Sequence, residues 1–598
     1  MRKQTKLVAV LSTAALLAIG ASMTSFAATG WAEEDGTWVY YDRNGDRVTD
    51  KWAKSGNNWY YLDSDGEMAI DQLIEDGDNY YYVDINGVMA TNQWVAIENE
   101  DAGEDDEPEH YWYYFQANGK ALKQGDSDKV SLKTVNGKKY AFDDEGKMLY
   151  GWVDENSAER IDNTDGDAFK EGVYYFGGED DGAMTTGWLL MDITYDEATA
   201  DEYKYTAPVF NDDEDQSRWF YFKSNGKKIY AEDGDGRTKD KTINGKKYAF
   251  DEYGAMVAEW SLDEDDEKTA SSSEELAKAS ATTPSNAWNG AGNYAKYAQA
   301  WKYFSSVEDG ARVSKGWFKV VPAEMLNEEK YDDDEESWYY ADGSGNLYAG
   351  EFKTIKGKKY AFRNDGRMLT GLKFIQEGND DFADVNADDD STYPFDNEDD
   401  FLDNAVEFYE PNGYKCYYFG GGDDGAMRTG KTVMSFDGEN TNFYFEKSGG
   451  HKGAGVTGEK DDKLYQSGLL LKADSDDKYT VVLKKTDKDD VVTYKKLDDA
   501  KEFMGSAGVV VDELDVETDK DKKISIGSGT YKVSKKCDDL SEAYNITYEA
   551  TTDGCKYEYI LVNTSGKIID SKSKNKDGND YYFMVEKGGK ITGIYVED

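Results

Sequence analysis

Few residues of this 598-residue sequence could carry out hydrolytic or transfer chemistry. Its two histidines, His110 and His451, lie in an acidic insertion and in a Gly-rich turn, whereas zinc hydrolases and Cys-His or Ser-His catalysts usually need at least one well-supported histidine. The 122 Asp and Glu residues supply many carboxylate pairs, but none stands out as an acid and base. We therefore predict a protein that is not an enzyme, with no catalytic residue, cofactor or metal site.

Aromatic residues, in contrast, recur at a constant interval of 21 residues near the N-terminus. The positions at this interval are Trp31, Trp52, Leu73 and Trp94; Trp38, Trp59 and Tyr80; and Gly45, Gly66 and Gly87. A constant period in this range indicates a repeat architecture, in which each unit buries its apolar face against its neighbour.

The elements that carry these rings are predicted to be β-hairpins. In "NNWYYLDSDGEMAID", residues 57–71, alternation along a strand places Trp59 and Tyr61 on one face and Tyr60 and Leu62 on the other. The turns hold Asp, Asn and Gly, and the flanks are Tyr, Phe, Trp and Val. A single hairpin cannot bury two apolar faces by itself, so the pattern predicts hairpins that stack lengthwise.

A second, longer sequence repeat is found after the N-terminal units. "VNGKKYAFDDEGKMLYG" at 135–151 recurs at 243–259 and 355–371, each time between two aromatic hairpins, which indicates three copies of a three-hairpin block. Beyond residue 447 the pattern fades into β-type runs. The predicted regions are a signal peptide, 1–27; N-terminal repeats, 28–97; divergent repeats with acidic insertions, 98–260; a linker with a short helix, 261–300; further divergent repeats, 301–446; and a β-rich C-terminal region of unknown role, 447–598.

The composition of the chain limits the classes of molecule that it could bind. The formal net charge of -53 argues against nucleic acid and anionic lipid and favours cations or cationic groups. The basic and apolar start of the chain is typical of a secretory signal peptide, and no later run is apolar enough to span a bilayer. We therefore expect a secreted protein without a membrane anchor. Cys537 and Cys555 could pair or could remain free together with Cys416.

The N-terminal units, "TGWAEEDGTWVYYDRNGDRVTD" and "KWAKSGNNWYYLDSDGEMAID", resemble the cell-wall-binding or choline-binding repeats of Gram-positive surface proteins. The resemblance is close over residues 29–95 and recognisable with insertions to about residue 434. It implies an all-β fold: an elongated, β-solenoid-like array of hairpins, here with a short helical linker and a β-rich C-terminal region. In that family, aromatic side chains of neighbouring hairpins form cages for choline on teichoic acid, and related repeats bind glucans.

By this resemblance, aromatic positions of the N-terminal units become candidates for ligand contact. The candidate ligand-binding residues are Trp31, Trp38, Tyr40, Trp52, Trp59, Tyr61, Tyr80, Tyr82 and Trp94. Ring faces can replace the water around a quaternary ammonium group, for about 2 kcal/mol when it is well desolvated, and flat rings can also stack on a sugar. The same rings could instead serve only to pack hairpins together. Met68 and Met89 are expected to have a structural role.

Departures from the repeat predict that ligand sites concentrate in residues 30–95. The positions equivalent to the first-strand tryptophan are Trp152, Trp260 and Leu372 and, at the next hairpin, Trp188, Trp317 and Lys431. Acidic insertions such as 384–395 have Asp389 and Phe395 where a calcium loop needs Gly and Glu, so we expect solvated loops there. We therefore predict a secreted, non-enzymatic wall-associated protein that binds cell-envelope polymers noncovalently. The alternative is a carbohydrate-binding adhesin or toxin-like lectin array, and a wall hydrolase with an unrecognised catalytic region ranks third. The oligomeric state is left open.

Overall fold

The chain is described here from a computed structural model. The described residues are 29–103, 107–194, 215–232, 237–262, 295, 298–324, 326–377, 382–385, 395–436, 438–516, 523–527, 529–532 and 540–597. The chain divides into two compact units, the first made of Met1–Asp196 with Asp213–Ile229 and the second of Glu197–Asp212 with Tyr230–Asp598. The predicted signal peptide and most of the predicted linker at 261–300 lie outside the described residues.

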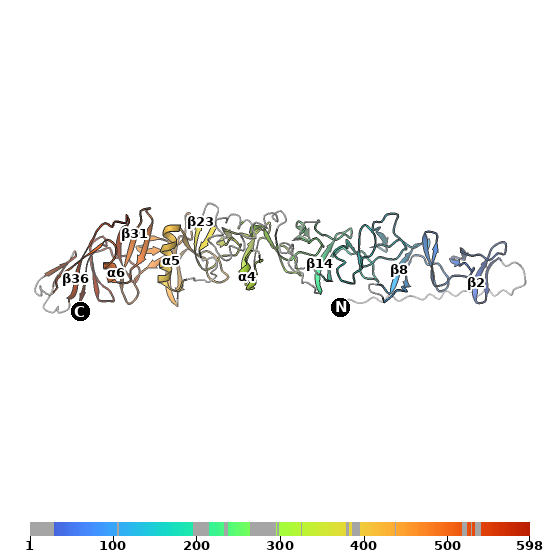
Figure 1. The fold of residues 1–598 in the computed structure, drawn as a ribbon, viewed down its shortest axis with the longest axis horizontal. Coiled ribbons are helices and arrows are strands. Elements are labelled where there is room, and N and C mark those ends of the chain that lie inside the picture. Colours follow the sequence, from blue (N-terminus) through green and yellow to red (C-terminus); the bar gives the residue numbers. More distant parts are fainter. Residues whose placement is uncertain are drawn as a thin grey trace. The chain divides into compact units, whose positions relative to one another are not determined.

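The first unit is a series of two-stranded antiparallel hairpins (Figure 1). Their strands, paired in chain order, are β1 (Gly30–Glu34) and β2 (Thr37–Tyr41), β3 (Lys51–Ser55) and β4 (Asn58–Leu62), β5 (Gln72–Asp76) and β6 (Asn79–Val83), β7 (Gln93–Glu98) and β8 (His110–Phe115), β9 (Lys133–Val135) and β10 (Lys138–Tyr140), β11 (Trp152–Val153) and β12 (Tyr174–Tyr175), and β13 (Gly187–Thr194) and β14 (Asp215–Phe222). The predicted hairpin array is confirmed.

Backbone hydrogen bonds join each hairpin to the one before it. After strand β4 the chain turns back, so that Met68 forms a bridge with Leu62. The backbone N–H of Met68 then donates to the carbonyl of Trp38 in the preceding hairpin, at 2.7 Å, and Met89 donates in the same way to Trp59, at 2.9 Å. Each unit therefore satisfies main-chain groups of its neighbour as well as burying rings on it.

The turns after β4 and β6 are Asp-x-x-Gly turns, and each fits onto the preceding unit. The carboxylate of Asp63 accepts hydrogen bonds from the backbone N–H groups of Asp65 and Glu67, at 2.9 and 2.8 Å, as an Asx turn does. Gly87, in the next such turn, has a φ of +74°, and a Cβ added there would lie 2.9 Å from the sulfur of Met68. The methionine of one unit therefore fills the space beneath the glycine of the next, which is the structural role expected of it.

The second unit begins with similar hairpins and then changes to wider sheets. Its two-stranded pairs are β15 (Lys241–Ile243) and β16 (Lys246–Tyr248), β17 (Glu259–Leu262) and β18 (Trp301–Phe304), β19 (Gly316–Val320) and β20 (Ser337–Ala341), β21 (Glu351–Ile355) and β22 (Lys358–Phe362), and β34 (Lys523–Ile526) and β35 (Gly529–Lys532). A three-stranded sheet has the order β24 (Phe382–Val385), β23 (Leu372–Glu377), β25 (Lys415–Tyr418).

Among the described residues, three further sheets and two helices complete the second unit. The sheets have the orders β26 (Gly430–Phe436), β27 (Glu439–Phe445), β30 (Leu469–Leu471), β29 (Lys463–Gln466), β28 (Gly458–Lys460); β32 (Val492–Lys496), β31 (Tyr479–Thr486), β37 (Lys556–Asn563); and β33 (Val509–Glu513), β36 (Leu540–Tyr548), β40 (Ile591–Glu597), β39 (Tyr581–Val585), β38 (Ser573–Lys576). The helices are α5 (Glu398–Asn412) and α6 (Ala500–Met504). The predicted β-rich region is thus built of wider sheets, around apolar clusters that include Phe401, Phe443, Phe503 and Leu561.

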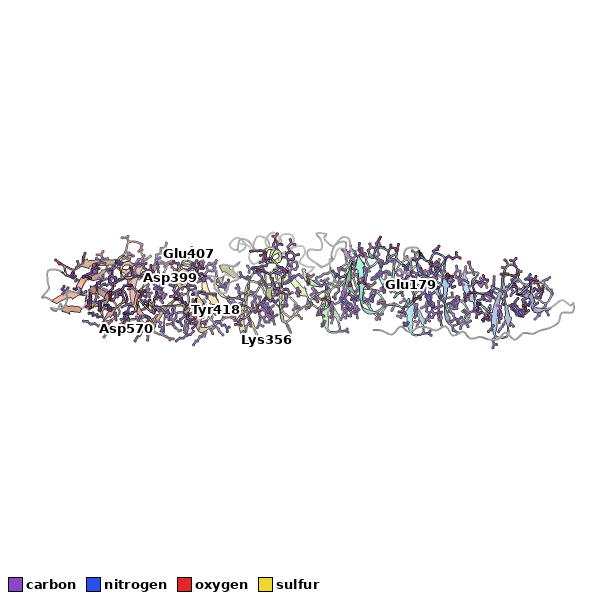
Figure 2. All side chains as sticks on the ribbon, turned by 90° about the horizontal axis from the view of Figure 1, so that it is seen from below. Glu179, Lys356, Asp399, Glu407, Tyr418 and Asp570 are labelled. Atoms are coloured by element: carbon purple, nitrogen blue, oxygen red, sulfur yellow. The ribbon has the colours of Figure 1, made fainter. Side chains whose placement is uncertain are left out.

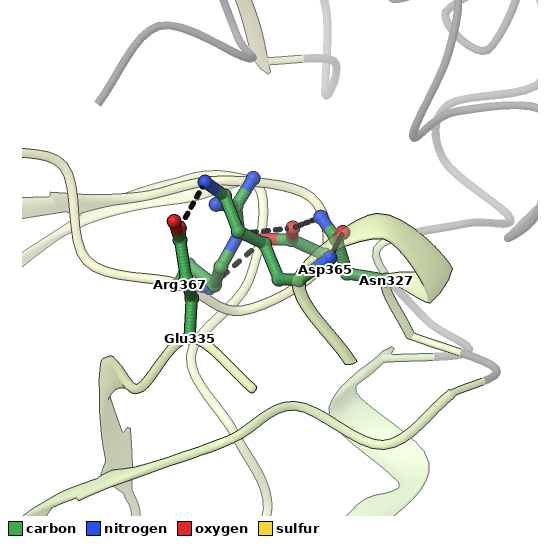
Figure 3. Close-up of polar contacts among 5 residues, drawn as sticks. Asn327, Glu335, Asp365 and Arg367 are labelled. Atoms are coloured by element: carbon green, nitrogen blue, oxygen red, sulfur yellow. Dashed lines mark hydrogen bonds and ion pairs between the residues drawn. The ribbon is translucent and has the colours of Figure 1, made fainter. Parts of the chain in front are cut away.

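A short helix, α4 (Glu328–Asp332), is inserted between β19 and β20, and polar side chains tie it to the chain beyond β22 (Figure 3). Asn327 caps the helix and donates from its amide to the carboxylate of Asp365, at 3.1 Å. The guanidinium of Arg367 donates to the same carboxylate, at 2.6 Å. Because all three side chains are buried, these bonds satisfy groups that would otherwise be costly to remove from water.

Both described cysteines are free thiols. Cys416 is buried in the core of the second unit, and Cys555 is partly buried. Cys537 lies outside the described residues. Among the described residues, no helix is both long and apolar enough to cross a bilayer.

Candidate functional site

The first-strand tryptophan of each N-terminal hairpin packs against a tyrosine directly opposite on the second strand. The antiparallel register pairs Trp31 with Tyr40 and Trp52 with Tyr61, and residues in such a pair share one face of the hairpin. Their ring centroids are 5.2 Å apart in both cases, with the planes at 70° and 65°. The two hairpins therefore present the same edge-to-face ring pair, an arrangement that aromatic rings prefer.

A third ring comes from the following hairpin. The Tyr60 ring lies 5.2 Å from that of Trp31, and the Tyr81 ring lies 5.0 Å from that of Trp52. We call these groups the Trp31 cluster (Trp31, Tyr40, Tyr60) and the Trp52 cluster (Trp52, Tyr61, Tyr81). Each cluster lies at a joint between two hairpins, because one face of the first meets the opposite face of the second.

The Trp94 joint repeats this geometry across a longer sequence interval. Trp94 lies 5.2 Å from Tyr114 in its own hairpin and 4.9 Å from Tyr140 in the next, and Phe142 stacks on it at 5.8 Å. The acidic insertions therefore do not interrupt the packing of rings, because they lengthen the connections and not the joints.

Leu73 changes the joint that lies between the Trp52 and Trp94 clusters. Here Leu73, Tyr80 and Tyr82 pack with Phe115 in one apolar cluster. Burial, together with a hydrogen bond from the Tyr82 hydroxyl to the Asp71 carboxylate, raises the pKa of Tyr82 well above its usual range. This joint therefore has a leucine where the Trp31 and Trp52 clusters have an indole.

Trp38 and Trp59 occupy positions different from those of the other candidates. They stand opposite Glu33 and Lys54 in the strand register. Trp59 is 40% exposed and has the Lys54 ammonium 5.7 Å from its ring. Among the described residues, neither ring packs edge to face on a neighbouring ring as Trp31 and Trp52 do. The structure thus brings Trp31, Tyr40, Trp52, Tyr61 and Trp94 into ring clusters and leaves Trp38 and Trp59 at their margin.

The third ring of each cluster was missed by the sequence analysis. Tyr60, Tyr81 and Tyr140 lie on the face that the prediction did not assign to ligand contact, because only residues sharing a face with the tryptophan were considered. The available signal was that both faces of "WYY" are aromatic, which lets consecutive hairpins meet through unlike faces.

The Trp152 joint contains an equivalent cluster that is closed. Trp152 lies 5.3 Å from Tyr175 in its own hairpin and 5.5 Å from Phe220 in the next. It is only 2% exposed, because the insertion between β11 and β12 covers it: a Cβ added at Gly172 would lie 2.6 Å from the Trp152 ring. The indoles of the Trp31, Trp52 and Trp94 clusters are only half-buried. The Trp152 joint therefore differs from the Trp31, Trp52 and Trp94 joints in the solvent exposure of its indole and not in its ring arrangement.

The closed cluster contains a cation supplied by the chain itself. The Lys228 ammonium lies 5.0 Å from the Trp152 ring and 5.9 Å from the Phe220 ring, and it donates a hydrogen bond to the carbonyl of Phe169. Lys228 is 2% exposed. A buried ammonium is costly unless its surroundings replace water, and here ring faces and a carbonyl do so.

A carboxylate stands beside the open Trp52 cluster. The indole N–H of Trp52 donates to the carboxylate of Asp76, at 3.1 Å. Burial raises the pKa of Tyr81 above its usual value, and the negative charge of Asp76 raises it further. The field of Asp76 therefore reaches the third ring, and this cluster is electrostatically suited to a cation.

Ring clusters persist in the second unit. Trp317 lies 5.1 Å from Tyr340, 4.8 Å from Tyr360 and 6.3 Å from Trp338. The indole of Trp338 donates to the carboxylate of Asp423, at 2.8 Å, as Trp52 does to Asp76. The geometry thus extends beyond residues 30–95, to which the sequence analysis assigned the ligand sites.

The histidines and the acidic side chains are the other residues whose placement bears on chemistry. His110 and His451 are both exposed. Within the described ranges, no group of three or more His, Cys, Asp or Glu side chains is arranged to hold a metal ion. Most of the calcium-like segment 384–395 lies outside those ranges.

The repeat seen in this geometry matches a known family model. The model of the choline-binding repeat matches residues 28–64 and 48–94. Residues 28–94 are therefore similar to choline-binding repeats. The match covers the Trp31 and Trp52 clusters, and it confirms the resemblance stated from the sequence. No match is found among curated proteins.

Several solved structures are similar to this chain. The modular autolysin LytC from Streptococcus pneumoniae, in complex with a synthetic peptidoglycan ligand, is 17% identical with a TM-score of 0.28, covering 58% of this chain and 54% of the autolysin. This chain thus spans about half the length of that autolysin. Choline binding protein F from the same organism is 17% identical with a TM-score of 0.20, covering 74% of this chain and 98% of that one. The choline-binding domain of Spr1274, also from that organism, is 29% identical over 16% of this chain and 96% of its own, with a TM-score of 0.12.

Proposed function

We propose that the protein is an exported, non-enzymatic component of the cell surface that binds choline-substituted polymers of the cell envelope through its open ring clusters. The Trp31 and Trp52 clusters are the first such sites. The match of residues 28–94 to the choline-binding repeat supports this proposal, and so does a feature of the chain's own chemistry.

The observation that carries the proposal is Lys228 in the closed Trp152 cluster. Phe220 occupies the strand position of Tyr81, and Lys228 occupies the position of Met89, since each bridges back to the second strand of its own hairpin, at Phe222 and at Val83. One joint of this array therefore already holds an ammonium group among a Trp ring and a neighbouring aromatic ring. An open joint with equivalent rings can hold an external ammonium for the same physical reason.

Electrostatics favours choline over a neutral sugar. The whole chain carries a formal charge of -53, and Asp76 adds a carboxylate next to the Trp52 indole. A positive ligand gains from both charges, while a neutral glycan gains from neither. Sugar stacking on the same rings remains the competing function, and a direct comparison of ligands decides between them.

The decisive experiment is calorimetric titration of the full chain with choline chloride and with 3,3-dimethyl-1-butanol, its neutral isostere. We expect saturable binding of choline, and binding of the isostere weaker by about tenfold or more, since the cation–π contribution is about 2 kcal/mol when desolvated. Equal affinities would contradict the proposal. Binding of a soluble glucan without binding of choline would favour the carbohydrate-binding alternative.

A separate experiment tests the non-enzymatic part of the proposal. Zymography of the full chain on gels that contain embedded cell walls should show no clearing. A clearing band would instead identify a wall hydrolase and would leave the binding proposal to be judged by the titration.

A further inference from the structure

The sheet β32–β31–β37 of the second unit ends in a strand whose outer edge is largely uncovered. Strand β37 pairs with β31 over its whole length, from Lys556 to Asn563, and it is the last strand of the sheet. On its other side the returning chain covers only one end: Ile569 donates to the carbonyl of Leu561, at 2.9 Å, and Asn563 donates to the carbonyl of Lys567, at 3.2 Å.

The direction of the free main-chain groups follows from these two bonds. Leu561 and Asn563 point their backbone groups away from β31, and in an antiparallel strand this direction alternates from residue to residue. The N–H and C=O groups of Tyr557 and Tyr559 therefore also point outward. Among the described residues, no strand pairing or backbone hydrogen bond covers them on that side. Exposed edge groups of this kind are a template for another strand.

A groove of about 680 Å³ runs along this edge. Four consecutive residues of β37, 557–560, line one wall. The opposite side is formed by the return at Lys567 and Ile568, the glycine turn at Gly588, and the β28–β29 turn at Asp462. Consecutive strand residues line a wall when the groove lies beside the backbone, because alternate side chains point to opposite faces.

The groove has an excess of negative charge. Its carboxylates are Glu459, Asp462, Glu558 and Asp570, and its ammonium groups are Lys567 and Lys590. Lys484 pairs with Glu558, at 3.1 Å. Asp570 is exposed in this C-terminal part of the chain (Figure 2). The groove is therefore complementary to a basic partner.

The tyrosine hydroxyls of the groove are already committed within the protein. Tyr557 donates to Asp553, Tyr559 to the carbonyl of Ala507, and Tyr548 to the carbonyl of Ile591. A sugar could therefore use only the charged side chains of the wall, whereas an extended peptide can also use the main-chain groups that Tyr557 and Tyr559 offer.

We propose that the edge of β37 is a docking site for an extended, basic peptide segment of a partner protein, which adds to the sheet as a further strand. Backbone hydrogen bonds to Tyr557 and Tyr559 hold the peptide, and the carboxylates of the groove select lysine or arginine side chains. This site is independent of the ring clusters and of the proposed choline binding.

The test uses the full chain and short capped peptides of alternating lysine and valine, with fluorescence anisotropy as the readout. We expect the basic peptide to bind and its glutamate–valine counterpart not to bind. N-methylation of the alternate peptide amides that face β37 should weaken binding by about tenfold or more, since it removes hydrogen bonds worth about 1 kcal/mol each. Equal binding of the methylated and unmethylated peptides would overturn the strand-addition proposal.

A pair of variants isolates the main chain from the side chain. Tyr557→Pro removes an outward N–H that β31 does not use, and proline is tolerated at such edges. Tyr557→Ala loses the same ring but keeps the N–H. We expect Tyr557→Pro to bind the basic peptide more weakly than Tyr557→Ala; equal affinities would contradict the proposal.

Two further measurements keep the proposal testable if either variant folds poorly. In the unaltered chain, hydrogen exchange should slow over residues 556–560 when the basic peptide is added, and slowing by a soluble oligosaccharide alone would instead identify a glycan groove. Asp462→Asn with Asp570→Asn should weaken the peptide by several-fold, whereas Asp489→Asn, in the exposed β31–β32 turn, should have no effect. Equal effects of the two would overturn the charge selection.

Discussion

The Trp52 and Trp152 joints are built from the same positions and end in different states. Each has a first-strand Trp, a Tyr opposite, and an aromatic residue from the next hairpin. At the first joint the indole is half-buried and a carboxylate lies beside it. At the second the indole is covered and a lysine of the chain occupies the ring faces.

This difference shows that ring geometry alone does not distinguish a binding joint from a packing joint. At the Trp152 joint, the insertion between β11 and β12 covers the rings, and Lys228 stands where other joints have a methionine. The same ring arrangement is therefore buried as part of the core. Under the proposed function, a joint is available to a ligand where no lysine of the chain occupies its rings and its indole is uncovered. This rule can be tested at matched positions of the two joints.

The largest expected effect is on stability at the closed joint. Trp152→Ala should lower the free energy of unfolding by about 3–5 kcal/mol, the usual cost of removing a fully buried large aromatic side chain, and should leave the choline titration unchanged. Trp52→Ala should cost much less stability and should remove the choline bound at its joint. Thermal unfolding and calorimetric titration of both variants make the comparison, with Trp52→Phe as the control. Retention of full choline stoichiometry by Trp52→Ala would show that the open joint is packing only.

A lysine should close the open joint. Met89 stands where Lys228 stands in the closed joint, so Met89→Lys should place an ammonium against the Trp52 and Tyr81 rings. We expect choline affinity at this joint to fall by about tenfold or more, because the internal cation competes for a cation–π interaction of about 2 kcal/mol. Met89→Leu is the control and should bind normally. If the two variants bind choline alike, the equivalence of Met89 and Lys228 is wrong.

A pH effect is expected at a turn of the first unit. Burial raises the pKa of Asp143 from its ordinary 3.8 to about 6, while its carboxylate accepts a hydrogen bond from the backbone of Lys147. The folded chain therefore holds a proton that the unfolded chain releases, so this group's contribution to stability is full below about pH 4 and is lost as the pH rises through about 6.

Asp143→Asn keeps an oxygen for the turn and cannot ionise. The variant's melting temperature minus that of the unaltered chain should therefore increase between pH 4 and pH 7. Measuring both proteins across this range cancels the pH effects of the other carboxylates. A constant difference would mean that Asp143 titrates normally in the folded protein.

The smallest expected effect concerns the carboxylate beside the open joint. Asp76→Asn should weaken choline binding about threefold at low salt and less at high salt, because exposed charges interact weakly and are screened. Asp78→Asn, in the same hairpin turn but without the bond to the Trp52 indole, is the matched control. Equal effects of the two substitutions would assign the change to net charge alone.

Much of the N-terminal fold was predictable because the repeat is visible in the sequence. The interval that places Trp31 and Trp52 in equivalent positions also fixes their hairpins, and alternation along the strand places Tyr40 and Tyr61 opposite them. Tyr60 and Tyr81 were missed because their role depends on how two hairpins meet, and strand alternation describes only one hairpin.

The closed joint was not predictable from residue types. Trp152 looks like Trp52 in the sequence, and its burial depends on an insertion that carries no repeat signal. Lys228 lies in a "GKK" segment that resembles an exposed turn, yet its ammonium is buried among rings. The groove beside β37 was also out of reach, since it depends on which strand ends a sheet.

The bond from each returning segment to the hairpin before it makes the array modular along the chain. If one whole repeat unit is removed or duplicated, the backbone N–H at the position of Met68 can still donate to the carbonyl at the position of Trp38 in the unit before it. No main-chain group is then left unpaired. Gene duplication could therefore change the number of ligand positions while preserving each joint, and long acidic segments could be inserted between strands at small cost. The valency of such a protein can thus evolve separately from the chemistry of its individual sites.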